Sequence, residues 1–250
     1  MTKLDLNPVI DKTSIYGFNG NPMSLITERR LEEKERRRNE ILEAATAVAS
    51  IVGFDDMTMD QVARKARLSR ALVYVYFQDK NDLLFGICNL ALGVLHTRFV
   101  EAASRHPRGL EKVEAIGRAY VAFAQEFPVF FDALARFEAH SPDVGRSVED
   151  PATNGTEVTP AHNNEVSCVL GGDRVHGTMV MVIEHGVRDG SIRSDVGPPQ
   201  LVAVTLWGFM HGIIQLASTK ANVLAHDGVS TNELINHALV MARRSLAVKE

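Results

Sequence analysis

Four side chains in one short basic stretch are suited to contact nucleic acid. Arg70, Tyr74, Tyr76 and Lys80 lie between positions 58 and 80, where five residues are basic and two are acidic. A guanidinium can bind guanine O6 and N7 in bidentate fashion, whereas an ammonium or a phenolic hydroxyl can bind phosphate. Because the whole chain carries a formal net charge of −4, any such contact must be local. The charge pattern is also typical of a solvated helix face, and a tyrosine also often packs.

Two short helices are predicted to position these side chains. Thr58-Met59-Asp60-Gln61 spells a capping box, which predicts a helix starting at Thr58. After a break at Arg67-Leu68, Ser69 is a suitable N-cap for a helix from Arg70 to about Tyr76. Two short helices joined by a brief turn form a helix-turn-helix, whose second helix can project into a major groove. The side chains expected to be exposed on that second helix are Arg70, Ala71, Tyr74 and Val75.

Longer predicted helices flank this motif. Residues 28–52 contain no Gly or Pro and have apolar residues at helical spacing, and Gly53 follows where a C-cap glycine is wanted. On the other side, Asp79 can cap a long fourth helix. Residues 1–27, which hold several glycines, prolines and asparagines, are expected to form a flexible arm.

The rest of the chain continues the helical pattern, with no stretch that alternates as a strand would. Residues 141–164 are polar and rich in Pro, Gly and Asn, and are expected to form a mobile insertion. The fold class is therefore predicted to be all-α. Helices are expected over residues 110–126, from Pro128, over 165–188 with an interruption at Gly171-Gly172, from Pro198-Pro199 to about Leu224, and from the capping box at Ser230 to Leu246.

The stretch from Arg38 to Leu84 resembles the DNA-binding domain of TetR-type transcriptional regulators. The 47 residues match in order without a gap. The resemblance implies a three-helix helix-turn-helix DNA-binding domain over residues 28–95 and a larger helical domain over residues 96–250 that binds an effector and dimerises. The matching pieces are Ile41-Leu42, Ala44-Ala45, Gly53-Phe54, Thr58, Val62-Ala63, Ala66-x-Leu68-Ser69, Leu72-Val73-Tyr74-x-Tyr76-Phe77 and Lys80-x-x-Leu83-Leu84.

Two positions depart from the family pattern. The family usually has Gly in the turn, where this chain has Arg67. A left-handed backbone costs a non-Gly residue about 1 kcal/mol, so either the turn differs or the strain is tolerated, and Arg67 can add a phosphate contact. At Val75 the family often has a polar residue, whereas valine can make only apolar contacts, for example with a thymine methyl.

The resemblance also implies roles for individual residues. Tyr74, Tyr76 and Lys80 match positions that contact phosphate in the family, and Arg70 is the candidate for a base edge. The hydroxyls of Thr58 and Ser69 can combine helix capping with a phosphate contact. The full set of predicted DNA-contacting residues is Thr58, Arg67, Ser69, Arg70, Ala71, Tyr74, Val75, Tyr76 and Lys80.

The C-terminal half carries a predicted dimer interface and a candidate effector site. The last two helices, about 198–224 and 231–247, are expected to form the interface, where Gly208 and Gly212 permit a close approach. Each aromatic or Met side chain taken singly is more typical of core packing. As a set, the candidates for an apolar effector pocket are Phe123, Phe127, Phe130, Phe131, Phe137, Met179, Trp207, Met210 and His211.

These observations favour a homodimeric, ligand-responsive regulator that binds a palindromic double-stranded DNA operator, most often as a repressor released by a small hydrophobic effector. A transcriptional activator, an effector-independent DNA-binding protein and an all-helical enzyme are the alternatives. Catalytic motifs and metal-ligand spacings are absent from the sequence, so no catalytic residue, metal or cofactor is expected. The two cysteines, the lack of a signal peptide and the lack of an uninterrupted apolar run favour a cytoplasmic protein without a membrane partner.

Overall fold

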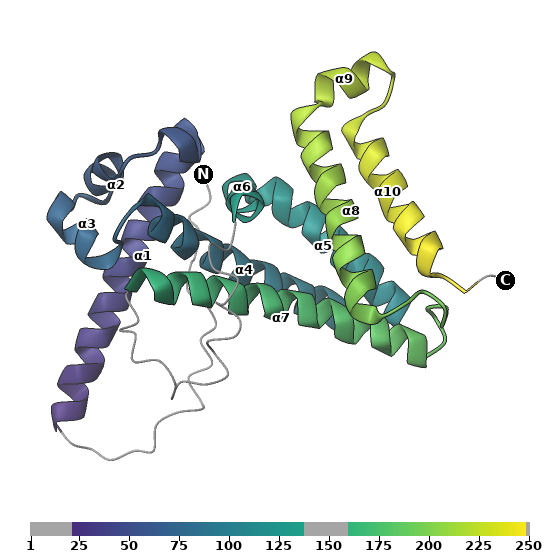
Figure 1. Cartoon of the computed structure of the whole chain (residues 1–250), viewed down its shortest axis with the longest axis horizontal. Coiled ribbons are helices and arrows are strands. Elements are labelled where there is room, and N and C mark those ends of the chain that lie inside the picture. The colour runs from purple at the N-terminus through teal and green to yellow at the C-terminus, as the bar shows by residue number, and fades with distance from the viewer. Residues whose placement is uncertain (1–21, 138–159, 249–250) are drawn as a thin grey trace. The chain divides into compact units, whose positions relative to one another are not determined.

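The computed structural model describes residues 22–137 and 160–248. Within these residues there are ten helices and no strand, which confirms the predicted all-α fold (Figure 1). The chain divides into two compact units. The first runs to Ile87 and includes the segment ending at Glu165, and the second begins at Cys88 and resumes at Val166. This boundary lies inside a helix, before the expected boundary at residues 95 and 96.

The first unit contains three helices and the beginnings of two more. The first helix starts at Pro22, so residues 22–27 are helical rather than part of the predicted arm; residues 1–21 lie outside the described residues. Gly53 has φ 77° and ψ 167°, a backbone that favours glycine, and it breaks the regular helix where the C-cap was predicted. The helices are α1 (Pro22–Asp56), α2 (Met59–Ala66), α3 (Arg70–Tyr76), the start of α4 (Lys80–Ser104) and the start of α7 (Pro160–Arg188).

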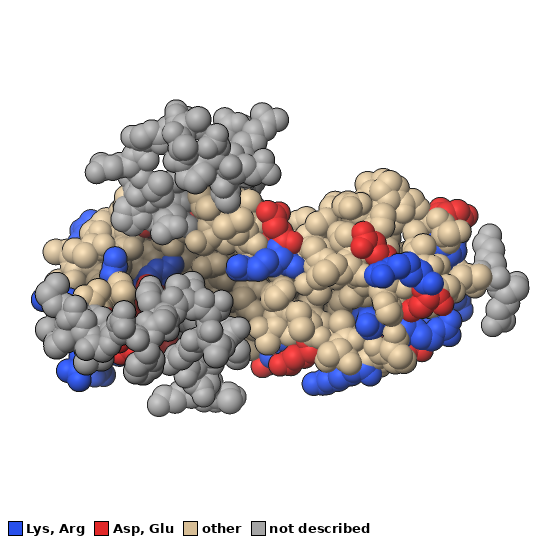
Figure 2. Space-filling model, turned by 90° about the horizontal axis from the view of Figure 1, so that it is seen from below, with Lys and Arg blue, Asp and Glu red and all other residues tan. Residues whose placement is uncertain are grey.

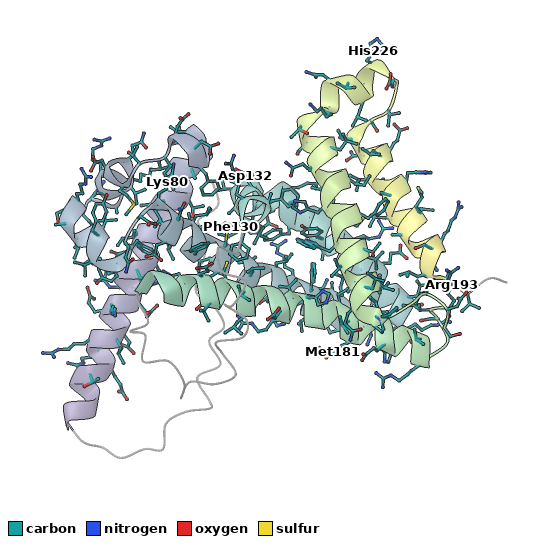
Figure 3. All side chains as sticks on the ribbon, viewed as in Figure 1. Lys80, Phe130, Asp132, Met181, Arg193 and His226 are labelled. Atoms are coloured by element: carbon teal, nitrogen blue, oxygen red, sulfur yellow. The ribbon has the colours of Figure 1, made fainter. Side chains whose placement is uncertain are left out.

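The second unit contains the remainder of α4 and α7 and five further helices. In Figure 1, α8 and α10 lie side by side and α9 joins them at one end. Phe130, labelled in Figure 3, points from α6 into the interior and is almost fully buried. The five helices are α5 (Gly109–Glu126), α6 (Pro128–Arg136), α8 (Pro199–Thr219), α9 (Ala221–His226) and α10 (Thr231–Leu246).

Three of the sequence-based helix boundaries in this region were wrong. Helix α7 begins at Pro160, so residues 160–164 are helical; residues 141–159 of the predicted insertion lie outside the described residues. The helix also runs unbroken through Gly171-Gly172, because Gly171 packs against the side chain of Leu92 and this contact offsets the poor helix propensity of glycine. The apolar helix α8 ends at Thr219, and Lys220 separates it from α9.

The loop after α7 caps the beginning of α5. Gly109 approaches the backbone of Gly186 so closely that an added Cβ atom would lie 2.2 Å from it. At this crossing the Gly109 N–H donates to Asp189 Oδ2 over 2.7 Å, and the Leu110 N–H donates to Ser191 Oγ over 3.0 Å. A carboxylate from a distant part of the sequence therefore satisfies a free N–H at the α5 N-terminus.

Acid is expected to remove the stabilisation that Asp189 provides. Burial opposes ionisation of this carboxyl, but hydrogen bonds from Ser191 and from the Gly109 N–H, with the nearby His185, outweigh it and lower its pKa to about 2. Since an unfolded Asp has a pKa near about 3.9, the stabilisation is complete above that pH and is lost as the pH falls towards about 2. Thermal melts should show Asp189→Asn destabilised by about 1–2 kcal/mol above pH ~5, with the deficit shrinking in acid. A deficit independent of pH would contradict this role.

Three helical segments are apolar enough to cross a membrane by length and composition alone. They are Lys80–Ser104, Asn164–Arg188 and Pro199–Thr219, although none is an uninterrupted apolar run. In the most apolar 18-residue stretch of Lys80–Ser104, half of the residues are buried inside the protein. In the corresponding stretches of the other two segments, 28% are buried. The apolar faces of α7 and α8 therefore remain partly uncovered in a single chain.

Candidate DNA-binding surface and ligand cavity

Local capping fixes both helices of the helix-turn-helix. The Gln61 N–H donates to Thr58 Oγ1 over 3.3 Å, and the Thr58 N–H donates to Gln61 Oε1 over 2.7 Å, which completes the predicted capping box. The Leu72 N–H donates to Ser69 Oγ over 3.2 Å at the start of α3. The Thr58 and Ser69 hydroxyls are therefore engaged in capping, as predicted, and both residues are exposed at helix N-termini.

The turn between the two helices keeps the geometry for which the family uses glycine. Arg67 adopts φ 58° and ψ 38°, the left-handed region, and its N–H donates to the carbonyls of Ala63 and Arg64. Among the described residues it is the one non-Gly residue with positive φ. Of the two outcomes left open by the sequence, the chain tolerates the strain, about 1 kcal/mol, and keeps the turn.

Packing under α3 determines which of its side chains face outward. Val62, Val73 and Phe77 are fully buried and hold α3 against α2 and the rest of the first unit. The opposite face of α3 is exposed, because residues three and four positions apart share a helix face. This face carries Arg70, Ala71, Tyr74 and Val75, as predicted, and Val75 is 71% exposed although it is apolar.

The candidate base-reading residue lies in a small cluster with Asp60 and Tyr74. Arg70 Nε is 3.2 Å from Asp60 Oδ1, and its Nη1 donates to Asp60 Oδ2 over 3.2 Å. The guanidinium also lies 5.5 Å from the centre of the Tyr74 ring. Asp60 was not predicted as a site residue; its ten-residue separation from Arg70 on another helix follows no local spacing rule.

The remaining predicted DNA contacts lie at the edge of this face. Lys80, labelled in Figure 3 at the start of α4, donates from Nζ to the Asp55 carbonyl over 2.9 Å and is half-buried. Tyr76 is also half-buried, whereas Arg67 is exposed. The ammonium of Lys80 is thus held near the end of α1, beside the motif and outside the reading helix.

A buried polar network anchors the end of α3. Asp82 Oδ2 accepts from the Gln78 N–H over 2.9 Å, and Asp82 Oδ1 accepts from Asn164 Nδ2 over 2.5 Å. Asn164 Oδ1 in turn accepts from Arg38 Nη2, and the Arg38 guanidinium lies 5.4 Å from the centre of the Phe77 ring. Asp82 is 1% exposed and Asn164 8%, so the network is buried. Asn164, the last residue of the predicted insertion, is therefore part of the support of α3.

Charge on the rest of the surface is mixed. In the face shown in Figure 2, Lys and Arg lie in small groups close to Asp and Glu, with uncharged areas between them. On α1, for example, Arg36 pairs with both Glu33 and Glu40 over 2.6 Å. This pattern agrees with the net charge of −4 and leaves nucleic-acid contact to a local surface.

The second unit encloses a cavity of about 490 Å³. Every residue that lines it belongs to this unit, and α4, α5, α6, α7, α8 and α10 contribute walls. The volume is within the range typical of sites for small molecules, about 300–1,000 Å³. The walls are mainly aliphatic and aromatic, with Leu92, Phe99, Ile116, Tyr120, Val169 and Leu206 as examples.

The structure brings only part of the predicted effector set to this cavity. Phe137, Met179, Trp207 and Met210 line it. The other five residues do not line the cavity. Phe123, Phe130 and Phe131 are buried in the core, and the half-buried Phe127 packs on Phe123 and Phe130. His211 stacks on Phe131 with ring centres 4.6 Å apart.

A polar group in the cavity wall was not predicted as a site residue. Tyr120 lines the cavity, and its hydroxyl lies 2.7 Å from His211 Nδ1. The Trp207 indole lies near this hydroxyl. Burial raises the pKa of Tyr120 and lowers the pKa of His211, so both are uncharged at neutral pH. Helical spacing placed Tyr120 on the buried face of its helix, but no local signal could reveal a cavity there.

The comparisons with known proteins agree with this geometry. Residues 41–87 match the family model of bacterial regulatory proteins of the tetR family. The chain is 44% identical over 62 residues to the HTH-type transcriptional regulator HbdR of Aromatoleum sp. strain CIB, a match that covers 25% of this chain and 26% of HbdR. The match thus spans about a quarter of that relative.

Longer matches extend beyond the helix-turn-helix. The chain is 28% identical over 184 residues to the HTH-type transcriptional regulator SrpR of Pseudomonas putida, which covers 73% of each. Among solved structures, the TetR family regulator PfmR of Thermus thermophilus superposes with a TM-score of 0.56 at 17% identity, covering 84% of this chain and 99% of PfmR. The fold of the whole described chain is therefore that of PfmR.

Proposed function

We propose that the chain is a DNA-binding transcriptional regulator of the tetR family, and that it acts as a homodimeric repressor released from its operator by a small apolar effector. The single observation that carries this proposal is the exposed face of α3, with Arg70 and Tyr74 on a helix capped and packed to project outward. The relatives compared are named as transcriptional regulators, which gives the enzyme alternative no support.

The proposed operator contacts divide into two kinds. Arg70 would read a guanine edge, and Val75 would make apolar contact with a base such as thymine. Tyr74, Tyr76, Lys80 and Arg67, with the helix N-termini at Thr58 and Ser69, would bind phosphates. Ala71, small and exposed, would allow α3 to approach the groove floor closely.

The proposed dimer forms through α8 and α10. These helices present exposed apolar side chains, including Leu201 at 62%, Trp207 at 58% and Met241 at 50%. Gly208 and Gly212 lie exposed in the same region of α8, where they would let two helices approach closely. A second copy would cover these exposed apolar side chains.

The proposed location is the cytoplasm, and the proposed effector site is the cavity of the second unit. Its apolar walls fit a small apolar molecule. The apolar helices α7 and α8 need no bilayer in this proposal, because dimerisation and the protein core would cover them.

A DNA shift assay tests the proposal. The probes are duplexes selected from a random pool by the protein, with a scrambled duplex of the same composition as control. Specific binding to a palindromic duplex, with two subunits per duplex, is expected. Repression is tested by placing that duplex in a reporter promoter: lower transcription in the presence of the protein is expected, and higher transcription would instead indicate an activator.

Lys80→Ala is expected to weaken binding to all DNA about equally. Its ammonium sits at the start of α4, outside the reading helix, and a point charge suits phosphate but not a base edge. The slope of a plot of the logarithm of affinity against the logarithm of salt concentration should become shallower by roughly one unit for each phosphate that the variant no longer neutralises. Affinities for the selected and scrambled duplexes, measured over a salt series, check this. A weakening confined to the selected duplex would contradict the assignment.

A further inference from the structure

We propose that the cavity of the second unit binds an uncharged, mainly apolar molecule carrying a hydroxyl group, with the hydroxyl placed on Tyr120. This inference rests on the proposed effector role of that unit and names the chemistry of the effector. It is carried by three observations: the nature of the cavity walls, the positions of the charged side chains near them, and the hydrogen bond already made by the Tyr120 hydroxyl.

The first step concerns charge. None of the described residues that line the cavity is both charged and buried. Glu114 and Arg243 line it, but they face each other over 3.4 Å, and Glu114 also pairs with Arg118 over 2.9 Å. Asp173, the remaining acidic lining residue, is exposed. A carboxylate or ammonium buried against the aliphatic walls would therefore lose its water without gaining an opposite charge, which is strongly unfavourable.

The second step concerns Tyr120, a hydrogen-bonding group of the buried wall. Tyr120 is 4% exposed, and its hydroxyl lies 2.7 Å from His211 Nδ1. A phenolic hydroxyl has one donor and two acceptor positions. The contact with His211 takes one of these three positions.

Two positions of the Tyr120 hydroxyl stay unused in either tautomer of His211. If Tyr120 donates to Nδ1, both acceptor lone pairs remain; if Nδ1–H donates to Tyr120, the O–H donor and one lone pair remain. A ligand hydroxyl can donate in the first case and accept in the second, so it fits both. A group that only accepts fits one case, and a group that does neither leaves a buried polar position unpaired.

The test uses Trp207 as the reporter, because it is the single tryptophan of the chain and lines the cavity. The probes share one alkyl chain and differ at one end: decanol, chlorodecane, decanoate and decylammonium. Decanol is expected to bind most tightly. Chlorodecane should bind about three- to tenfold more weakly, the range of one neutral hydrogen bond, and the two ions weaker still by at least about tenfold.

Tyr120→Phe tests whether the Tyr120 hydroxyl binds the hydroxyl of the ligand or only stabilises the fold. It should lower decanol affinity about three- to tenfold, to the level of chlorodecane, and leave chlorodecane unchanged. A residue with only a structural role would weaken both probes together. Calorimetric titration of the same pairs guards against a change in Trp207 emission caused by the loss of the neighbouring Tyr120 hydroxyl, and thermal melts establish that the variant folds.

A matched pair of glycines on α7 tests the location. An added Cβ meets nothing within 4 Å at either Gly172 or Gly177, but only Gly172 lines the cavity. Gly172→Leu should abolish decanol binding by filling the space, whereas Gly177→Leu should leave it unchanged. Full decanol binding by Gly172→Leu would overturn the site.

The outcomes separate this inference from the proposed function. Tighter binding of decanoate or decylammonium than of decanol, an equal loss of decanol and chlorodecane in Tyr120→Phe, or no binding of any probe would overturn the ligand class. The DNA shift assay is independent of these titrations. Loss of specific DNA binding would overturn the proposed function and leave the cavity chemistry standing. Decanol that binds the cavity without releasing DNA would overturn only the effector role.

Discussion

Arg70→Ala is expected to lower affinity for the selected operator by about 2–6 kcal/mol per dimer, or at least about 30-fold, and to relax preference at one base pair in each half-site. The guanidinium projects from the exposed face of α3, and each of the two half-sites would lose one guanine contact of about 1–3 kcal/mol. Binding titrations against duplexes with every substitution at each position measure both effects.

Two variants control for charge alone. Arg64→Ala removes an exposed arginine of α2 away from the α3 face, so it should weaken selected and scrambled duplexes alike. Asp60→Asn removes the partner of Arg70 but keeps the guanidinium. Since exposed ion pairs contribute at most about 1 kcal/mol, it should change operator affinity by less than about fivefold for each half-site. If Arg70→Ala weakened both duplexes equally, Arg70 would be a phosphate contact.

The second large effect is expected at the proposed dimer interface. Gly208→Arg combined with Gly212→Arg should yield monomers at micromolar concentration and weaken operator binding by about a thousandfold, because one of two linked half-sites is lost. Within one chain an added Cβ meets nothing within 4 Å at either position, so the substitutions create no clash in the subunit itself. Replacing glycine also favours the helix by about 1 kcal/mol per residue. Sedimentation measures the subunit state.

A third glycine supplies the matched control for that variant. Gly93 on α4 is exposed and also has nothing within 4 Å of an added Cβ, so Gly93→Arg should remain dimeric. A doubly substituted protein that stays dimeric with unchanged operator affinity would show that α8 does not form the interface. Circular dichroism of all three proteins establishes that each remains helical.

Local rules predicted the elements whose ends are decided by neighbouring residues. The capping boxes at Thr58 and Ser230 and the N-cap at Ser69 each act within three positions along the chain, so the sequence alone is enough to place them. The exposed face of α3 followed from the same periodicity. The low helix propensity of glycine led to the wrong prediction of an interruption at Gly171-Gly172. There Gly171 packs against Leu92 from another helix, and α7 is continuous.

Residues that meet only in the folded chain could not be predicted. Asp60 approaches Arg70 because α2 and α3 pack at an angle, and Asp189 caps α5 across 80 positions. The aromatic composition suggested a pocket, but the assignment of Phe123 to the core and of Trp207 to the cavity wall depends on how six helices pack. The composition could not distinguish these two roles.

The support of α3 has a consequence for how the protein is made. Asn164 is 82 positions beyond Asp82 and 126 beyond Arg38, so a ribosome releases Asp82 long before its partner. Until then the nascent chain holds a carboxylate and a guanidinium whose shared partner does not yet exist. The polar network that supports α3 can therefore form only after Asn164 has been synthesised, and its formation includes a long loop closure that a contiguous N-terminal unit would avoid.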